Sequence, residues 1–170
     1  EILGEGSTNA PVNDLILTGA DSGWRRLHEP FRGARGFDAW LRAIAARGAS
    51  TNFGSFVGAS TIRMYGKGMA EGPATRAELD SMRAAMTRAM EDGAFGLASA
   101  LIYPPGAYAT TRELVEMGKA MAPFHGTYIT HMRLPGGCSG MGWAVMSVIA
   151  APCPWGTGGT RRHRRRCLGS

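Results

Sequence analysis

The chain lacks cysteine throughout residues 1–137 and lacks Asp, Glu and Lys throughout residues 134–170. The only cysteines are Cys138, Cys153 and Cys167. They are odd in number and their spacings match no zinc-binding template, so cysteine usage gives no argument for a redox compartment.

Long apolar runs are also missing, since no stretch approaches the roughly 20 residues needed to span a bilayer. The start, Glu1-Ile2-Leu3, has neither an initiator Met nor the charged and then apolar regions of a leader. We therefore expect a soluble, cytoplasmic chain without a membrane partner, whose sequence starts inside a longer protein.

The positive charge is concentrated at one end. Of the 19 basic residues, five arginines lie in 134–170, which leaves 19 − 5 = 14 basic residues against 13 acidic ones in 1–133. The body is thus nearly neutral. The 44% hydrophobic content of the whole chain suits one domain with a real core. The net charge of +6 does not predict nucleic-acid binding by that body.

Capping patterns mark the predicted helices. Thr75 with Glu78, and Thr110 with Glu113, have the spacing of a capping box, in which each side chain accepts a hydrogen bond from a backbone amide of the first turn. Apolar residues at helical spacing follow each box. The predicted helices run from the N-cap Asp38 to Gly48, from Thr75 to Gly93 and from Thr110 to Pro123.

Strands are predicted at 1–3, 52–58, 95–102 and 127–132, between those helices. Alternating strands and helices with short connections are typical of βαβ units in a parallel sheet. A doubly wound sheet is the alternative, but Gly4-Glu5-Gly6 lacks the third glycine and the following helix of a dinucleotide-binding motif. We therefore predict an α/β fold that is part of a TIM-like barrel.

Residues that follow barrel strands converge on one pocket at the C-terminal ends of the strands. Here they are Glu5, the segment Ser60 to Arg63, Tyr103, His131 and Arg133. Carboxylate and imidazole suit zinc, and arginine pairs with carboxylates through two hydrogen bonds. The set indicates metal-assisted hydrolysis of an anionic substrate. The alternative from pattern alone is structural: a hydrogen-bonded His131, a solvated Glu5 and a Tyr103 that packs its loop.

Specific blocks of sequence carry a family resemblance. The blocks are 92–109, 113–114 and 128–133, with support from 52–58 and from the opening 1–6. Over about residues 1–133 the chain resembles the N-acyl-D-amino-acid deacylases (D-aminoacylases) of the amidohydrolase superfamily. The resemblance implies a metal-dependent (β/α) barrel with a small accessory β domain, of which this chain is a fragment incomplete at both ends.

The implied reaction is hydrolysis of the amide of a small N-acyl-D-amino acid with one or two zinc ions, which polarise the carbonyl and activate water. By position, His131 matches the metal-binding histidine of the family's T-H-M-R motif. Glu5 takes the place of a metal-bridging cysteine found in many members. Tyr103, Arg63 and Arg133 are the implied substrate-binding residues.

Other family residues have no counterpart here. The His-x-His pair would precede Glu1, and the catalytic aspartate and a later histidine would follow His131, so no catalytic acid or base is assigned. We therefore expect the isolated chain to bind zinc weakly or not at all and to have no turnover. A related amidohydrolase of cyclic amides, similar to hydantoinases or dihydropyrimidinases, is the alternative activity.

Residues 134–170 form the second predicted segment, an aberrant and disordered basic tail after the barrel fragment 1–133. If acidic residues occurred there as in 1–133, a gap of this length would arise roughly 2% of the time, which favours a shifted reading frame. The alternative is a non-catalytic protein that uses this tail to bind nucleic acid. It is disfavoured because the tail has no interleaved aromatic residues and no recognisable module.

Overall fold

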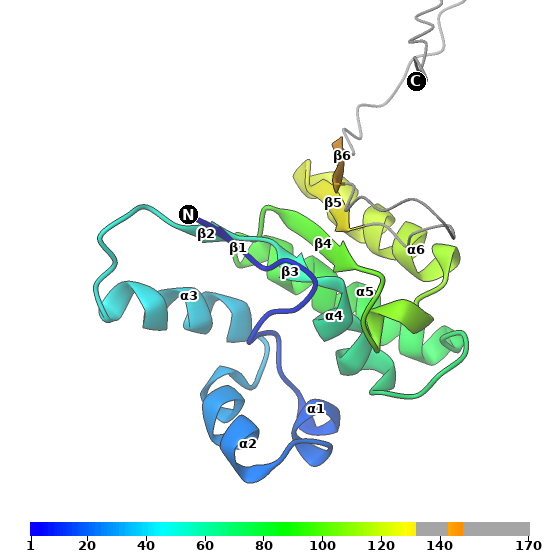
Figure 1. Cartoon of the computed structure of the whole chain (residues 1–170), viewed down its shortest axis with the longest axis horizontal. Coiled ribbons are helices and arrows are strands. Elements are labelled where there is room, and N and C mark those ends of the chain that lie inside the picture. The colour runs from blue at the N-terminus through cyan, green and yellow to red at the C-terminus, as the bar shows by residue number, and fades with distance from the viewer. Residues whose placement is uncertain (132–142, 148–170) are drawn as a thin grey trace, which may run out of the picture.

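Figure 1 shows a computed structural model of the chain, which describes residues 1–131 and the backbone of 143–147. Its strands form two parallel sheet segments and one antiparallel edge. The strands are β1 (Ile2–Leu3), β2 (Gly54–Ser55), β3 (Val57–Gly58), β4 (Gly96–Ala100), β5 (Thr127–His131) and β6 (Trp143–Ser147).

Strands β2 and β3 are two halves of the single strand predicted at 52–58. They are separated only by Phe56, whose amide donates to the carbonyl of Leu3 on β1. β1 pairs in parallel with β2, β3 with β4, and β4 with β5. The four predicted strands therefore lie side by side in chain order, and the predicted parallel α/β arrangement is confirmed. The described residues do not form a closed barrel.

β6 pairs antiparallel with β5, with His131 opposite Trp143. A barrel of parallel strands would place a parallel neighbour there. β6 belongs to the segment 134–170, which was predicted to be disordered, and the rest of that segment lies outside the described residues.

The helices include all three that capping patterns predict and three shorter ones that they do not. They are α1 (Asp14–Thr18), α2 (Ser22–His28), α3 (Gly36–Ala46), α4 (Ala59–Lys67), α5 (Arg76–Glu91) and α6 (Thr111–Met121). α1, α2 and α4 have five, seven and nine residues, too few for an apolar periodicity to be recognised. Within the described ranges, no helix combines the length and apolarity needed to cross a membrane.

The start of α3 corrects one prediction. Arg35, rather than Asp38, is the N-cap, and Asp38 lies inside the first turn. The backbone amide of Asp38 donates instead to the carboxylate of Asp92, at 3.1 Å, and Asp92 also pairs with Arg35 at 2.7 Å. The helix is therefore capped by a side chain that is remote in sequence, which local patterns cannot reveal.

Helix α5 provides much of the core. Leu79, Met82, Met86 and Met90, predicted to form its apolar face, are all buried. They pack in one cluster with Val57 and Leu97 from the sheet and with residues of α3 and α6. This packing anchors the strands whose C-terminal ends carry the candidate site.

The capping box of α5 is confirmed and leads to a pH-dependent prediction. The Thr75 amide donates to the Glu78 carboxylate at 2.6 Å and holds the pKa of Glu78 below its ordinary value of 4.5. Because the folded pKa is the lower one, the stabilisation is complete above pH 4.5 and is lost as the pH falls through the folded pKa.

We expect Glu78→Ala to lower the free energy of unfolding at about pH 7, and the loss to shrink towards about pH 3. Urea denaturation across this range measures it. Glu91→Ala, an exposed change at the other end of α5, is the matched control and should show no such loss. A loss for Glu78→Ala that stays constant with pH would contradict the role of the ionised carboxylate.

Candidate functional site

Glu5 and His131, separated by 126 residues in sequence, meet at the C-terminal ends of the parallel strands. The Nδ1 atom of His131 lies 3.3 Å from Oε1 of Glu5. His131 is the last residue of β5 and is 8% exposed, whereas half of the Glu5 side chain is accessible. A nearly buried imidazole and a half-exposed carboxylate therefore face one another at the edge of the sheet.

The turn that carries Glu5 depends on the glycines on both sides of it. Gly4 and Gly6 have φ values of +96° and +71°, which other residues rarely adopt. A Cβ on Gly4 would lie 2.0 Å from the carbonyl oxygen of Phe56, and one on Gly6 would lie 2.8 Å from the Cβ of Ala100. The turn is thus packed directly against the strand ends, and this packing brings Glu5 to His131.

Hydrogen bonds join the same turn to the first residues of α4. The amide of Thr8 donates to Oγ1 of Thr61 at 2.8 Å, and that hydroxyl donates to the Thr8 carbonyl at 2.9 Å. The amide of Ser60 donates to the carbonyl of Gly6 at 2.9 Å. Helix α4, absent from the sequence prediction, therefore fixes the segment that presents Glu5.

The direction of His131 follows from the alternation of side chains along β5. Thr130 and Tyr128 lie on the other face, where their hydroxyls each lie 2.8 Å from Oγ of Ser99. His131 shares its face and its register position with Ala100 of β4. The small Ala100 side chain leaves space beside the imidazole.

A pocket of about 720 Å³ contains both residues. Its polar side chains include four that the sequence placed on this rim, and Trp24, Met64 and Met69 add apolar walls. The four polar residues are Glu5, Ser60, Tyr103 and His131. Tyr103 is 63% exposed and lies at the start of the loop after β4. The structure thus brings together the predicted carboxylate, phenol and imidazole.

Arg63 does not line this pocket, contrary to its predicted position beside the substrate. It is 1% exposed; its Nη1 donates to Glu113 at 2.5 Å and its Nη2 donates to the carbonyls of Ala70 and Gly72, both at 2.9 Å. Arg63 sits on α4, which turns its guanidinium away from the strand ends and into the protein. Arg133, the other predicted arginine, lies outside the described residues.

The position of Arg63 away from the pocket is explained by its ion pair with Glu113. As predicted, its amide donates to Oγ1 of Thr110 at 3.3 Å, but its carboxylate does not complete the capping box. Instead the carboxylate pairs with Arg63 and accepts the amide of Ala74 at 2.9 Å. The ion pair therefore holds the segment 68–74, which includes the pocket residue Met69.

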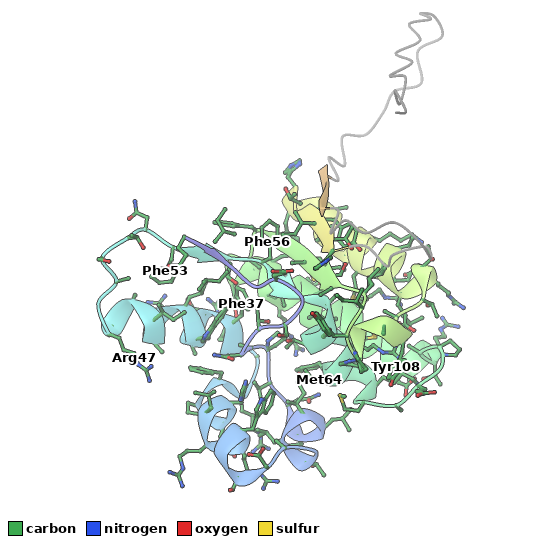
Figure 2. The ribbon with its side chains drawn as sticks, viewed as in Figure 1. Phe37, Arg47, Phe53, Phe56, Met64 and Tyr108 are labelled. Carbon is green, nitrogen blue, oxygen red and sulfur yellow. The ribbon has the colours of Figure 1, made fainter. Side chains whose placement is uncertain are left out.

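Sequence reasoning did not find the apolar walls of the pocket. Trp24 comes from α2, Met64 from α4 and Met69 from the segment after α4. None of these elements was predicted, and a single Trp or Met gives no pattern of its own. Figure 2 labels Met64, which packs against the small core cluster around α1.

Two side chains of the pocket are of a kind that ligates metal ions. A carboxylate oxygen and an imidazole nitrogen are both donors that zinc accepts, and they already converge here. Residues 1–131 contain no group of three potential metal-ligating side chains. Because zinc normally takes four ligands, Glu5 and His131 fit the ion but would need further ligands from elsewhere.

Comparisons of the sequence with family models gave no match. Two curated proteins of Alcaligenes xylosoxydans xylosoxydans are similar to the chain: a D-aminoacylase, 37% identical over 97 residues, and an N-acyl-D-aspartate deacylase, 37% identical over 98. Each match covers 57% of this chain and 20% of the relative. The chain thus spans about a fifth of the length of the curated relatives it matches.

Solved structures give the same result. A D-aminoacylase described as defining a novel subset of amidohydrolases superposes with a TM-score of 0.63 at 32% identity, over 78% of this chain and 28% of that one. A D-aminoacylase studied for its binuclear metal centre gives 0.59 at 28% identity, over 75% and 27%. The family resemblance seen in the sequence is confirmed over this part of the chain.

Proposed function

We propose that residues 1–131, which resemble the D-aminoacylases in both sequence and fold, are part of a metal-dependent enzyme that hydrolyses the amide bond of N-acyl-D-amino acids. One observation carries the proposal. The two residues assigned as metal ligands, Glu5 and His131, are remote in sequence and lie 3.3 Å apart at the C-terminal ends of parallel strands. Active sites of (β/α) barrels occupy this end.

The proposed barrel is supported by the strand order. β1, the interrupted strand β2–β3, β4 and β5 follow one another in parallel, as consecutive strands of a barrel do. Helices α4, α5 and α6 connect or follow them (Figure 1). The remaining strands would have to come from sequence outside the described residues.

Zinc is the proposed metal, and when bound it would polarise the substrate carbonyl and lower the pKa of water. Glu5 and His131 would hold the ion from one side. Tyr103, at the rim of the pocket, would orient the substrate through its hydroxyl, and Arg133 would pair with the substrate carboxylate. Arg63 has no part in this proposal because its guanidinium is engaged by Glu113. The cytoplasmic location and the absence of a nucleic-acid partner stay predictions.

A chimaeric enzyme tests the function. The matching fifth of the Alcaligenes D-aminoacylase is replaced by the corresponding part of residues 1–131, and hydrolysis of N-acetyl-D-leucine is assayed with added zinc. We expect turnover by the chimaera and none by the isolated chain, since residues 1–131 bring no third metal-ligating side chain to Glu5 and His131. His131→Asn should reduce kcat/KM more than about 100-fold, because it removes a metal ligand itself rather than a supporting contact.

His125→Asn is the matched control, because His125 is exposed and asparagine tolerates its left-handed backbone. It should leave kcat/KM unchanged. Circular dichroism and zinc content separate misfolding from loss of chemistry. A chimaera that folds and binds zinc but does not hydrolyse the amide would contradict the proposed function, and equal activity of both variants would contradict the role of His131.

A further inference from the structure

A second hollow, of about 580 Å³, adjoins the candidate site. It lies between α1, α2, α4 and the segment 68–70, and three residues line both spaces: Trp24, Met64 and Met69. We call this hollow the apolar chamber. The two spaces are therefore neighbours that meet at these three side chains.

The chamber is lined mainly by apolar side chains. Leu15 and Ile16 of α1 line it together with Trp24 and Met69. Three of these side chains are large and accessible, with Leu15 46%, Trp24 37% and Met69 58% exposed. Accessible apolar groups gathered around a hollow indicate a binding site more strongly than the same groups scattered over a surface.

The charged residues of the chamber are already engaged. A carboxylate oxygen of Asp21 accepts the amide of Trp24 at 2.8 Å as the N-cap of α2, and Nζ of Lys67 lies 3.4 Å from Oε2 of Glu78. A substrate carboxylate placed here would meet the negative charge of Asp21 and a lysine already paired. The end of a substrate that fits this chamber is therefore apolar and uncharged.

The walls are held in place before any ligand arrives. The Trp24 ring stacks on the His28 ring with centroids 3.4 Å apart, and His28 is 2% exposed with Nδ1 2.8 Å from the Trp24 carbonyl. Arg63 holds the carbonyl of Ala70, next to Met69. A preformed pocket binds more tightly because less side-chain ordering is needed on binding.

We propose that the apolar chamber binds the aliphatic acyl chain of an N-acyl-D-amino acid whose amide lies at the Glu5–His131 pair. This inference rests on the proposed function and names the preferred substrate class: medium-chain N-acyl-D-amino acids, which bind more tightly than the N-acetyl compounds that the same site accepts. The acyl chain is chosen over the amino-acid end because the latter carries the carboxylate that Asp21 disfavours.

Binding to the full 170-residue chain tests the inference by isothermal titration calorimetry, with N-octanoyl-D-leucine and N-acetyl-D-leucine as probes. Each fully buried methylene strengthens binding by roughly fourfold. If two to three of the additional methylenes of the octanoyl chain are buried, this probe should bind about 30-fold more tightly than the acetyl probe. Leu15→Asp, which places a charge in the chamber, should abolish this preference. Leu27→Asp is the matched control, since Leu27 is 52% exposed and lines neither space, and it should keep the preference.

Other results would overturn the inference. Equal binding of the two probes would do so, as would loss of the preference in both Asp variants. A stronger gain from N-acetyl-D-2-aminodecanoic acid than from the octanoyl probe would assign the chamber to the amino-acid side chain. If the chain binds the octanoyl probe more tightly but the chimaera hydrolyses no N-acyl-D-amino acid, the result would support acyl-chain binding in the apolar chamber and contradict the proposed function. If the chimaera hydrolyses the amide but the chain binds both probes equally, the result would support the proposed function and contradict acyl-chain binding in the apolar chamber.

Discussion

Replacing Glu113 by leucine is expected to lower the free energy of unfolding by about 3–5 kcal/mol, the usual effect of removing one partner of a buried ion pair. Glu113 and Arg63 are 2% and 1% exposed, and their side chains meet at 2.5 Å. Without the carboxylate, the Arg63 charge is left buried and the amide of Ala74 loses its acceptor. Urea denaturation monitored by circular dichroism measures the change.

A double variant distinguishes two causes of the lost stability: loss of the attraction between Arg63 and Glu113, and burial of the Arg63 charge without its partner. Arg63→Met combined with Glu113→Leu removes both charges, so we expect it to be less destabilised than Glu113→Leu alone. Asp14→Asn breaks the exposed pair of Asp14 with Arg32, which are joined at 2.6 Å, and should change stability little. The interpretation fails if Glu113→Leu is as mild as Asp14→Asn.

The second large effect is expected from Gly58→Ala. A Cβ at this position would lie 2.3 Å from Cα of Ser7 and 2.5 Å from its nitrogen, and backbone atoms cannot give way as a flexible side chain can. The turn that carries Glu5 must then move. We expect a loss of stability of about 1–3 kcal/mol, typical of overpacking, together with loss of the contact between Gly6 and Ala100.

Gly118→Ala is the matched control, since a Cβ at Gly118 meets nothing within 4 Å. Alanine in the helix interior should raise stability by roughly 0.5–1 kcal/mol. Thermal denaturation gives the stability changes, and nuclear Overhauser contacts between Gly6 and the Ala100 methyl group report the position of the turn. If Gly58→Ala keeps these contacts at full strength, Glu5 is not positioned through this packing.

Two local capping patterns are arranged by the tertiary structure in ways that the sequence did not predict. Thr110 and Glu113 have the spacing of a capping box, yet the Glu113 carboxylate bonds to Arg63, fifty residues away. Asp38 was predicted to be the N-cap of α3, yet its side chain does not cap that helix. Its backbone amide instead donates a hydrogen bond to the carboxylate of Asp92. In each case the partner comes from another element of the fold and not from the neighbouring sequence.

Some residues of the candidate site were predicted from the sequence, and others were placed by tertiary contacts. Glu5 and Tyr103 follow predicted strands and His131 lies at the end of one, so the geometry of parallel sheets was enough to predict their convergence. Arg63 also follows a predicted strand, but it lies in a helix that was not predicted, and its guanidinium therefore turns away from the pocket. The apolar walls Trp24 and Met64 come from short helices without recognisable periodicity.

The amino-acid sequence alone determined the alternation of strands and longer helices, the apolar face of α5 and the position of His131 at the end of a strand. These features could be predicted because capping, helical periodicity and strand alternation depend on residues that are close together in the sequence. Tertiary structure decided which charges pair, where Arg63 points, how the glycine turn presents Glu5, and that an apolar chamber lies beside it. These outcomes depend on contacts between segments fifty or more residues apart, where packing and burial select the partner.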